Sequence, residues 1–186
     1  MKYRYVEFQD TAESAQYRSA AAWLYDIVTT FVVTILILGI IVCFVGKSAR
    51  VSGQSMSPTL SDQDQLLIVN ITNKYQRGDI VVIGRGSEKT LIKRIIAMEG
   101  DTIDINFQTG QVFLNGELLQ EPYVAEPTYL SYGDGPTFPV TVPTGYAFVM
   151  GDNRNDSLDS RSGEVGFIPV QSIIGKMAWN FGHYAG

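Results

Sequence analysis

The sequence predicts a mainly β protein, in which an N-terminal transmembrane helix precedes an antiparallel β-sheet or barrel-like domain. Three observations predict this fold. An uncharged apolar run covers residues 27–46, short β-branched segments between turn-forming residues recur from residue 65 onward, and Asn115-Gly116 stands between apolar flanks. The Asn-Gly pair is typical of a two-residue hairpin turn. The 186 residues suffice for one hydrophobic core and an accessory segment.

The apolar run divides the N-terminal part of the chain. Residues 1–26 form a polar leader, of which "ESAQYRSAAAWLYD" is the most helix-prone part. A helix over 27–46 spans about 30 Å, the thickness of the hydrocarbon core of a bilayer. The run is longer than the core of a cleavable signal peptide, and it lacks the charged face usual for a helix of a soluble domain. The lipid bilayer is therefore an expected partner. Cations on both sides of the run favour a cytoplasmic N-terminus only weakly: Lys2, Arg4, Arg18, Lys47 and Arg50.

Residues 47–186 have the pattern of one β domain. In the segment "DTIDINF", Ile103, Ile105 and Phe107 alternate and are expected on one face of a strand. Strands or hairpins are predicted over the following ranges: 65–71, 78–84, 90–98, 101–107, 111–119, 145–152 and 172–181.

Composition excludes several classes of protein. A net charge of −5 disfavours a nucleic-acid partner. The single cysteine, Cys43, lies within the apolar run, so the β domain has neither a disulfide nor a cysteine metal site. Metal-binding histidine spacings are absent, and the polar segment "GDNRNDSLDSR" does not fit the EF-hand pattern. The sequence therefore predicts neither a metal nor a cofactor.

The segment "SGQSMSPTL" offers three serine hydroxyls as candidate nucleophiles: Ser52, Ser55 and Ser57. A serine nucleophile needs a base, and the only histidine, His183, stands near the end of the chain. A Ser-His-Asp triad is therefore disfavoured. Ser52 and Ser57 are also compatible with ordinary loop hydroxyls.

Lysine can replace histidine as the base only when it is neutral, which requires burial in apolar surroundings. Strand alternation places Lys93 on one face with Leu91, Ile95 and Ala97, and turns Arg94 to the other face with Ile92 and Ile96. The remaining candidates stand beside polar, charged or membrane-edge residues: Lys47, Lys74, Lys89 and Lys176. Lys93 is thus the candidate base, although an edge-strand lysine that discourages aggregation is the alternative interpretation.

Four segments in order resemble those of bacterial type I signal peptidases, the leader peptidase family, in its compact single-anchor form. They are "SGQSMSPTL" (52–60), "RGDIVVI" (77–83), "IKRIIAMEGD" (92–101) and "MGDNRNDSLDSR" (150–161). The resemblance implies a catalytic β domain over 47–186 on the extracytoplasmic side of the cytoplasmic membrane. In this domain, 102–145 is a short variable insertion. It also implies a single-pass anchor over 27–46 and a cytoplasmic leader over 1–26.

Carried over position by position, the resemblance makes Ser55 the nucleophile and Lys93 the general base. Ser157 would donate or accept a hydrogen bond that orients the lysine, and Asp159 and Arg161 would form an ion pair that shapes their loop. Asp152, Asn153 and Arg154 fall in the same segment with structural roles.

The resemblance also assigns oxyanion and substrate contacts. The oxyanion donor would be the Ser55 backbone N–H, because Gly53 stands where some members carry a serine. Substrate-binding positions would be Gly53, Gln54, Leu91 and Ile92.

The activity implied is removal of signal peptides from exported preproteins after small residues of the A-x-A type, by a membrane-anchored serine endopeptidase with a Ser-Lys dyad. The signal peptides are then the substrates, and the secretion machinery is a candidate partner. Two alternatives remain open from the sequence. One is another Ser-Lys processing protease with a dedicated partner, and the other is a catalytically inactive membrane-anchored β domain that binds secretory proteins.

Overall fold

The computed structural model describes residues 12–70, 74–86 and 89–182. The first part of the predicted leader, residues 1–11, and His183 lie outside the described residues. The chain divides into two compact units, Met1–Phe44 and Val45–Gly186. The units meet between Phe44 and Val45, whereas the sequence predicted a boundary between residues 46 and 47.

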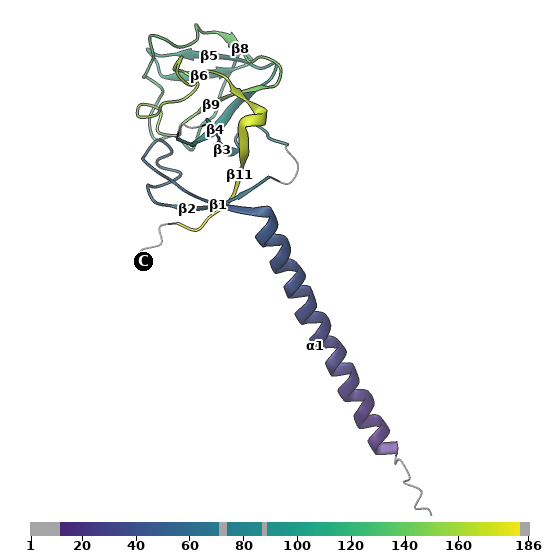
Figure 1. Cartoon of the computed structure of the whole chain (residues 1–186). Coiled ribbons are helices and arrows are strands. Elements are labelled where there is room, and N and C mark those ends of the chain that lie inside the picture. The colour runs from purple at the N-terminus through teal and green to yellow at the C-terminus, as the bar shows by residue number, and fades with distance from the viewer. Residues whose placement is uncertain (1–11, 71–73, 87–88, 183–186) are drawn as a thin grey trace, which may run out of the picture. The chain divides into compact units, whose positions relative to one another are not determined.

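The N-terminal unit contains one long helix, α1 (Ala12–Val45), which is labelled in Figure 1. Its segment Ala21–Ile40 is long and apolar enough to cross a membrane, and none of that segment is buried by other parts of the protein. Leu, Ile and Phe side chains without a protein partner require an apolar environment, which the hydrocarbon core of a bilayer provides. The helix begins well before residue 27, so the helix-prone end of the leader continues into the apolar run.

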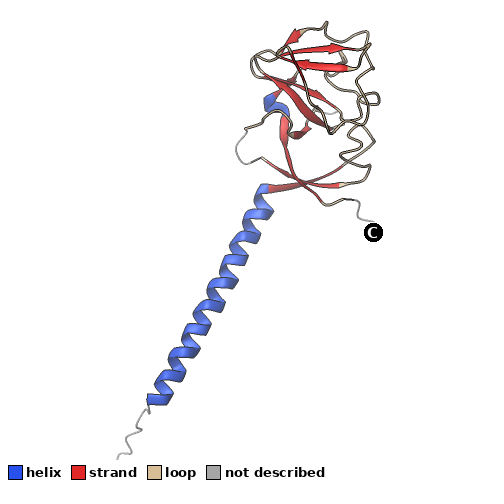
Figure 2. Cartoon of the chain, turned by 180° about the vertical axis from the view of Figure 1, so that it is seen from behind, coloured by secondary structure: helices blue, strands red, loops and turns tan. Residues whose placement is uncertain are grey.

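The β domain contains a seven-stranded antiparallel sheet with strand order β1-β2-β11-β3-β4-β9-β10. Figure 2 shows these strands in red, joined by long tan loops. The strand bounds are β1 (Gly46–Arg50), β2 (Gln65–Val69), β3 (Ile80–Ile83), β4 (Leu91–Met98), β9 (Tyr146–Met150), β10 (Ile168–Pro169) and β11 (Ile173–Asn180). A short 3-10 helix, η1 (Val170–Ser172), leads from β10 to β11.

A second, four-stranded antiparallel sheet has the order β7-β6-β5-β8. Its strands are β5 (Thr102–Asn106), β6 (Gln111–Leu114), β7 (Glu117–Leu118) and β8 (Val140–Thr141). The predicted hairpin turn is confirmed between β6 and β7: Asn115 and Gly116 both have positive φ, 53° and 85°. Positive φ at both central residues is the geometry that Asn-Gly tolerates best.

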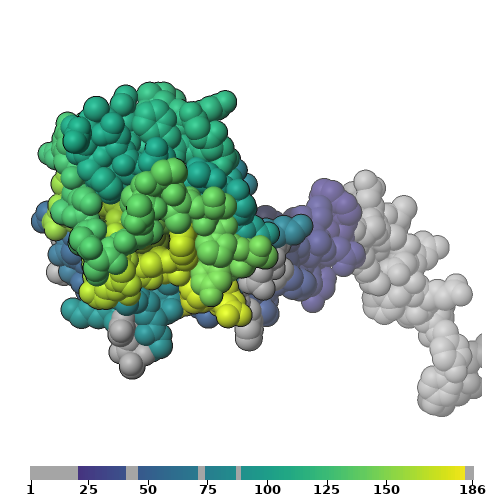
Figure 3. All heavy atoms as spheres, turned by 90° about the horizontal axis from the view of Figure 1, so that it is seen from above, coloured from purple at the N-terminus to yellow at the C-terminus, as the bar shows by residue number. Residues whose placement is uncertain are grey.

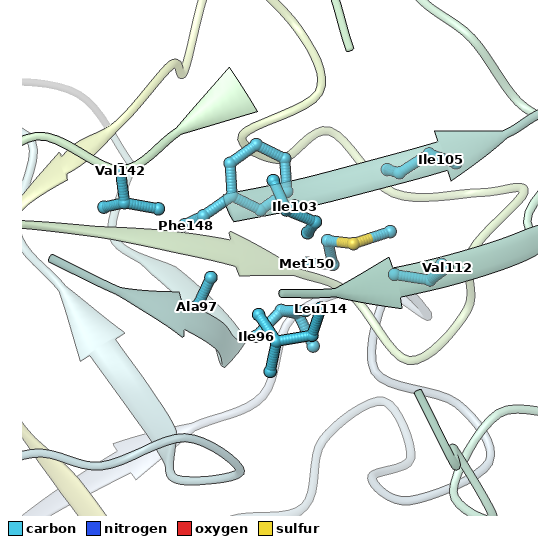
Figure 4. Close-up of a cluster of buried hydrophobic side chains, with 9 residues drawn as sticks. All are labelled: Ile96, Ala97, Ile103, Ile105, Val112, Leu114, Val142, Phe148 and Met150. Atoms are coloured by element: carbon cyan, nitrogen blue, oxygen red, sulfur yellow. The ribbon is translucent and has the colours of Figure 1, made fainter. Parts of the chain in front are cut away.

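The main hydrophobic core lies between the two sheets (Figure 4). It joins side chains of β4 and β9 with side chains of β5 and β6, together with Val142. The predicted apolar face of β5 is confirmed, since Ile103 and Ile105 are buried and Phe107 packs against the cluster. A view from above shows the green middle part of the chain lying against the yellow C-terminal part (Figure 3).

Strand β4 departs from simple alternation near its end. Its register against β9 shifts between Ile95 and Ala97. Ile96 and Ala97 therefore both enter the core between the sheets, whereas Ile95 joins a separate cluster. The prediction that Ala97 shares the face of Lys93 was wrong, because the extra residue of a β-bulge changes which face the following side chains occupy.

The seven predicted strand or hairpin ranges are each occupied by strands, and three short strands were not predicted: β1, β8 and β10. Strands β8 and β10 have two residues each, too few to show a period. The sequence of β1, "GKSAR", lacks β-branched and aromatic residues, so only its pairing with β2 reveals it as a strand.

Candidate active site

Ser55 lies in a tight loop between β1 and β2, residues 51–64, which we call the serine loop. Met56 and Leu60 are both 1% exposed and anchor this loop in a small hydrophobic cluster. The Ser57 N–H donates to the carbonyl of Gln54 at 2.9 Å, which closes a turn around Ser55. Gly53 has φ of 90°, a value that glycine adopts without strain. The loop therefore presents Ser55 from a rigid turn.

Lys93 lies in the middle of β4 and reaches Ser55 across 38 residues of sequence. Its Nζ lies 2.6 Å from Ser55 Oγ, within hydrogen-bonding distance, and the residue is only 3% exposed. Its cross-strand partner is Val81, which is completely buried. The predicted apolar surroundings are confirmed for Leu91 and Ile95, which belong to the same hydrophobic cluster as Val81.

Burial lowers the pKa of Lys93 from 10.5 to about 8, because the charged ammonium loses its hydration. The carboxylate of Asp159 opposes this change and raises the pKa, whereas the guanidinium of Arg161 lowers it. At pH 7 roughly one amine in ten is then neutral, against roughly one in 3,000 for an ordinary lysine. The site therefore holds an amine that can accept a proton near neutral pH.

A buried carboxylate ties the serine loop to the strand that carries Lys93. Asp152 is 1% exposed and accepts hydrogen bonds from Arg94 Nε at 2.8 Å and from Arg94 Nη2 at 2.6 Å. Its Oδ2 also accepts the hydroxyl of Thr59 at 2.5 Å. Asp152 thus bridges β4 and the serine loop. Asp152 was predicted to have only a general structural role and Thr59 was not predicted, since no local pattern links residues 93 positions apart.

Residues 151–163, which we call the polar loop, form a network behind Ser55. Asp159 accepts a hydrogen bond from Ser157 Oγ at 2.8 Å, from the Gly151 N–H at 3.0 Å and from Arg161 Nε at 2.8 Å. Both side chains of the Asp159–Arg161 ion pair are fully buried. A side chain at position 151 would overlap Ser157 Oγ and the Ser55 carbonyl, so glycine is required there.

The geometry of Ser157 differs from the expectation. Its hydroxyl donates to Asp159, and the hydrogen bonds of the described residues include none between Ser157 and Lys93. A carboxylate is the strongest acceptor within reach, and it directs the hydroxyl proton away from the lysine. The expected ion pair of Asp159 and Arg161 is present. The Ser157 hydroxyl bonds to the carboxylate of this pair and not to Lys93.

A groove of about 370 Å³ opens beside the two side chains. Its lining includes Ser55, Lys93, Leu91 and Ile92. Gly53 and Gln54 are not among its lining residues and lie in the adjacent turn, where the Gln54 carbonyl accepts from Asn153 Nδ2 at 3.2 Å. The remaining lining residues come from β1, from the serine loop, from β2, β3 and β11, and from the position before β4: Lys47, Ser48, Ala49, Arg50, Val51, Ser52, Met56, Ile68, Val82, Ile174 and Thr90.

Among the described residues, two backbone edges along this groove have no strand partner and can pair with an extended peptide. Strand β1 stands at the end of the sheet order. In β4 the pairing with β9 begins only at Arg94, so Leu91, Ile92 and Lys93 pair with β3 on one side alone. Unpaired strand edges beside a groove are the usual setting for binding of an extended chain. Within the described part of the chain, no group of three or more His, Cys, Asp or Glu residues could hold a metal ion.

A serine hydroxyl in contact with a buried lysine, at the end of an open groove, is the arrangement of a serine hydrolase in which lysine takes the place of histidine. Comparison with known proteins specifies the family. The model of the family "Signal peptidase, peptidase S26" matches residues 24–181, well over half of the chain. The chain belongs to the signal peptidase family, peptidase S26.

Curated relatives agree with this assignment. The chain is 37% identical over 168 residues to a signal peptidase I of Bacillus amyloliquefaciens, a match that covers 86% of each chain. It is 36% identical over 174 residues to signal peptidase I S of Bacillus subtilis, covering 88% of this chain and 90% of the relative. A signal peptidase I from Enterococcus faecalis with a solved structure is 30% identical, with a TM-score of 0.45, over 55% of this chain and 96% of that one. The protein is a serine endopeptidase that processes signal peptides, with an N-terminal apolar helix as its membrane anchor.

Proposed function

We propose that Ser55 is the nucleophile and Lys93 the general base with which this signal peptidase cleaves exported preproteins. The observation that carries the proposal is the 2.6 Å separation of Lys93 Nζ and Ser55 Oγ, with the lysine 3% exposed. The neutral amine removes the hydroxyl proton as Oγ attacks the scissile carbonyl. The ammonium formed then donates its proton to the leaving amine. In the second half, the amine activates water, which releases the acyl group from Ser55.

The oxyanion of the tetrahedral intermediate needs a donor close to Oγ. In the described part of the chain, the Ser55 N–H donates to no protein acceptor, while its carbonyl accepts from the Asn153 N–H at 3.0 Å. The Ser55 N–H is therefore available to the oxyanion. The Gly53 N–H already donates to Asp62 at 2.7 Å and is occupied. Ser157, Asp159 and Arg161 support the site by holding the polar loop against it.

The substrate in this proposal is an extended peptide that pairs with the free edges of β1 and of β4 at Leu91–Lys93. Leu91 and Ile92 line the groove and limit its depth, which favours the small side chains of an A-x-A cleavage site. Gly53 and Gln54 would border the peptide from the adjacent turn. The anchor holds the site at the extracytoplasmic face of the cytoplasmic membrane, with a single pass over 27–46, where the apolar part of a signal peptide leaves its scissile end.

Processing of a preprotein with an A-x-A site tests this substrate assignment. Replacement of the alanine just before the scissile bond by phenylalanine is expected to slow cleavage by about 10–100-fold, because a shallow pocket cannot hold the ring. N-terminal sequencing of the mature product locates the bond that is cleaved. The matched control replaces the middle residue of the A-x-A site. Equal rates for all three preproteins would contradict the assignment, and cleavage of only one dedicated partner would favour the alternative Ser-Lys processing protease.

The pH dependence of turnover tests the lysine base. A general base works in its deprotonated form, so activity is expected to rise with pH through the Lys93 pKa of about 8. Activity is expected to increase roughly tenfold between pH 7 and pH 9 and to level off above pH 9. Initial rates on a peptide substrate, with detergent-solubilised protein at constant ionic strength, check this. A flat profile between pH 6 and pH 10 would argue against lysine as the base.

A further inference from the structure

A segment between β7 and β8, within the insertion, packs on the polar loop. Residues 121–135, which we call the strap, contain no strand or helix. At its first end, the fully buried guanidinium of Arg154 forms an ion pair with Glu121 and donates to Thr128 Oγ1 at 3.0 Å. In its middle, the backbone N–H groups of Tyr129 and Leu130 donate to Asn155 Oδ1 at 2.9 and 3.1 Å.

The second end of the strap contacts the residues behind Ser55. The Tyr132 hydroxyl donates to the Ser157 carbonyl at 2.7 Å, and the Leu130 carbonyl accepts from Arg161 Nη1 at 3.1 Å. The Tyr132 ring lies 5.9 Å from the Arg161 guanidinium, within range of a cation–π interaction. A side chain at Gly135 would overlap the Arg161 carbonyl, so the strap approaches the polar loop at backbone contact there.

Among the described residues, the Tyr132 hydroxyl is the one donor at an ordinary hydrogen-bond distance from the Ser157 carbonyl. The other donor to this oxygen, Arg161 Nη2, lies at 3.5 Å, at the limit of a hydrogen bond. Arg161 Nη2 also donates to Asp159 at 2.9 Å and to the Arg154 carbonyl at 2.7 Å. If the tyrosine hydroxyl is removed, the carbonyl can regain a full hydrogen bond only by drawing this guanidinium away from Asp159.

We propose that Tyr132 is a positioning residue for catalysis, which fixes Ser157 and thereby the Asp159–Arg161 pair against the Ser55–Lys93 site. It touches neither the substrate groove nor the reacting atoms, and it acts through the polar loop. The inference rests on the proposed roles of Ser55 and Lys93. It assigns a catalytic contribution to the insertion 102–145, which the sequence indicated only as a variable segment.

Tyr132 affects catalysis by limiting the hydration of the Lys93 amine. The charged groups that act most strongly on Lys93 come from the polar loop: Asp152, Asp156, Asp159 and Arg161. A loosened polar loop admits water to the amine, which weakens the largest cause of the lowered pKa, whereas the opposing effects of Asp159 and Arg161 weaken together. Because burial is the largest cause, hydration favours the ammonium and returns the Lys93 pKa toward its ordinary value.

Tyr132→Phe tests the proposal, because it removes the hydroxyl and keeps the ring beside Arg161. We expect kcat at pH 7.5 to fall roughly five- to tenfold, the effect of one hydrogen bond to a buried carbonyl, with KM unchanged. The midpoint of the pH profile is expected to move to higher pH. The matched control is Tyr129→Phe on the same strap, whose side chain is 52% exposed and makes no polar contact among the described residues. It is expected to retain the wild-type kcat and profile.

Full-length protein in detergent serves for all variants, and a thermal melt of each shows that it is folded at the assay temperature. A Tyr132→Phe enzyme with wild-type kcat and an unshifted profile would overturn the proposal. An equal loss in Tyr129→Phe would overturn it too, since it would show a general effect of the strap. Ser55→Ala separates this outcome from failure of the proposed function. If Ser55→Ala is inactive while Tyr132→Phe behaves as wild type, only the positioning role falls.

Discussion

Ser55→Ala and Lys93→Ala are each expected to reduce preprotein processing by at least about 10³-fold, the largest effect of any substitution in this chain. Ser55→Ala removes the atom that attacks the carbonyl. Lys93→Ala leaves that atom without a base, since the closest amine to Ser55 Oγ is that of Lys93, at 2.6 Å. The measurement is a time course of mature product from a preprotein incubated with solubilised enzyme.

A third substitution distinguishes proton transfer from simple charge. Lys93→Arg keeps the cation at the same place, but the guanidinium cannot give up its proton near neutral pH. It is therefore expected to be as inactive as Lys93→Ala. Activity in Lys93→Arg near the wild-type level would show that the cation acts only by its charge.

Matched controls for both residues exist in the chain. Ser57→Ala removes a neighbouring hydroxyl of the serine loop, and Lys89→Ala removes an exposed amine just before β4. Both are expected to process the preprotein at nearly the wild-type rate. Wild-type rates in Ser55→Ala would refute the dyad, and an inactive wild type would favour the alternative of a catalytically inactive domain that binds secretory proteins.

Asp159→Asn is expected to have the largest effect on stability, a loss of about 3–5 kcal/mol in the free energy of unfolding. The Asp159 and Arg161 side chains are both fully buried, so loss of the carboxylate leaves a buried guanidinium without its counter-ion. The amide of asparagine also brings a donor to a place where the carboxylate accepts from Gly151, Ser157 and Arg161. All three donate to Oδ2, and Arg161 Nε donates to Oδ1, so either orientation of the amide sets its NH2 group against at least one donor.

Thermal unfolding followed by near-ultraviolet circular dichroism of the β domain measures this loss. A decrease of about 10 °C or more in the melting temperature is expected. The control is Asp156→Asn in the same polar loop, where the exposed side chain predicts a change within about 0.5 kcal/mol. A melting temperature for Asp159→Asn equal to that of Asp156→Asn would show that the buried pair contributes little to the fold.

The helix and the β domain are subject to different physical constraints, and this explains why the membrane-spanning helix could be predicted from the sequence. A membrane-spanning helix must be apolar on every side over a fixed length, and the segment Ala21–Ile40 meets that requirement without any tertiary contact. Helical structure continues through the polar residues before the run to Ala12, in agreement with the helix-prone segment predicted over residues 13–26. The helix therefore begins at Ala12, nine residues before the apolar segment that can cross the membrane begins at Ala21.

Features that depend on local periodicity follow from the order of residues along the chain. The long apolar helix, the Asn115-Gly116 turn and the alternation of β5 follow from neighbours along the chain. Alternation along β4 also made Lys93 the candidate base, because its neighbours at i±2, Leu91 and Ile95, are apolar.

Contacts between distant segments depend on the tertiary structure. It brought Lys93 to 2.6 Å from Ser55, tied Thr59 and Arg94 to Asp152, and turned the Ser157 hydroxyl toward Asp159. It also placed a β-bulge in β4 and laid the strap on the polar loop. Each of these depends on sheet order and on competition among buried donors and acceptors. The outcome of this competition depends on which donors and acceptors lie close together in the folded protein. The spacing of side chains along one strand does not contain that information.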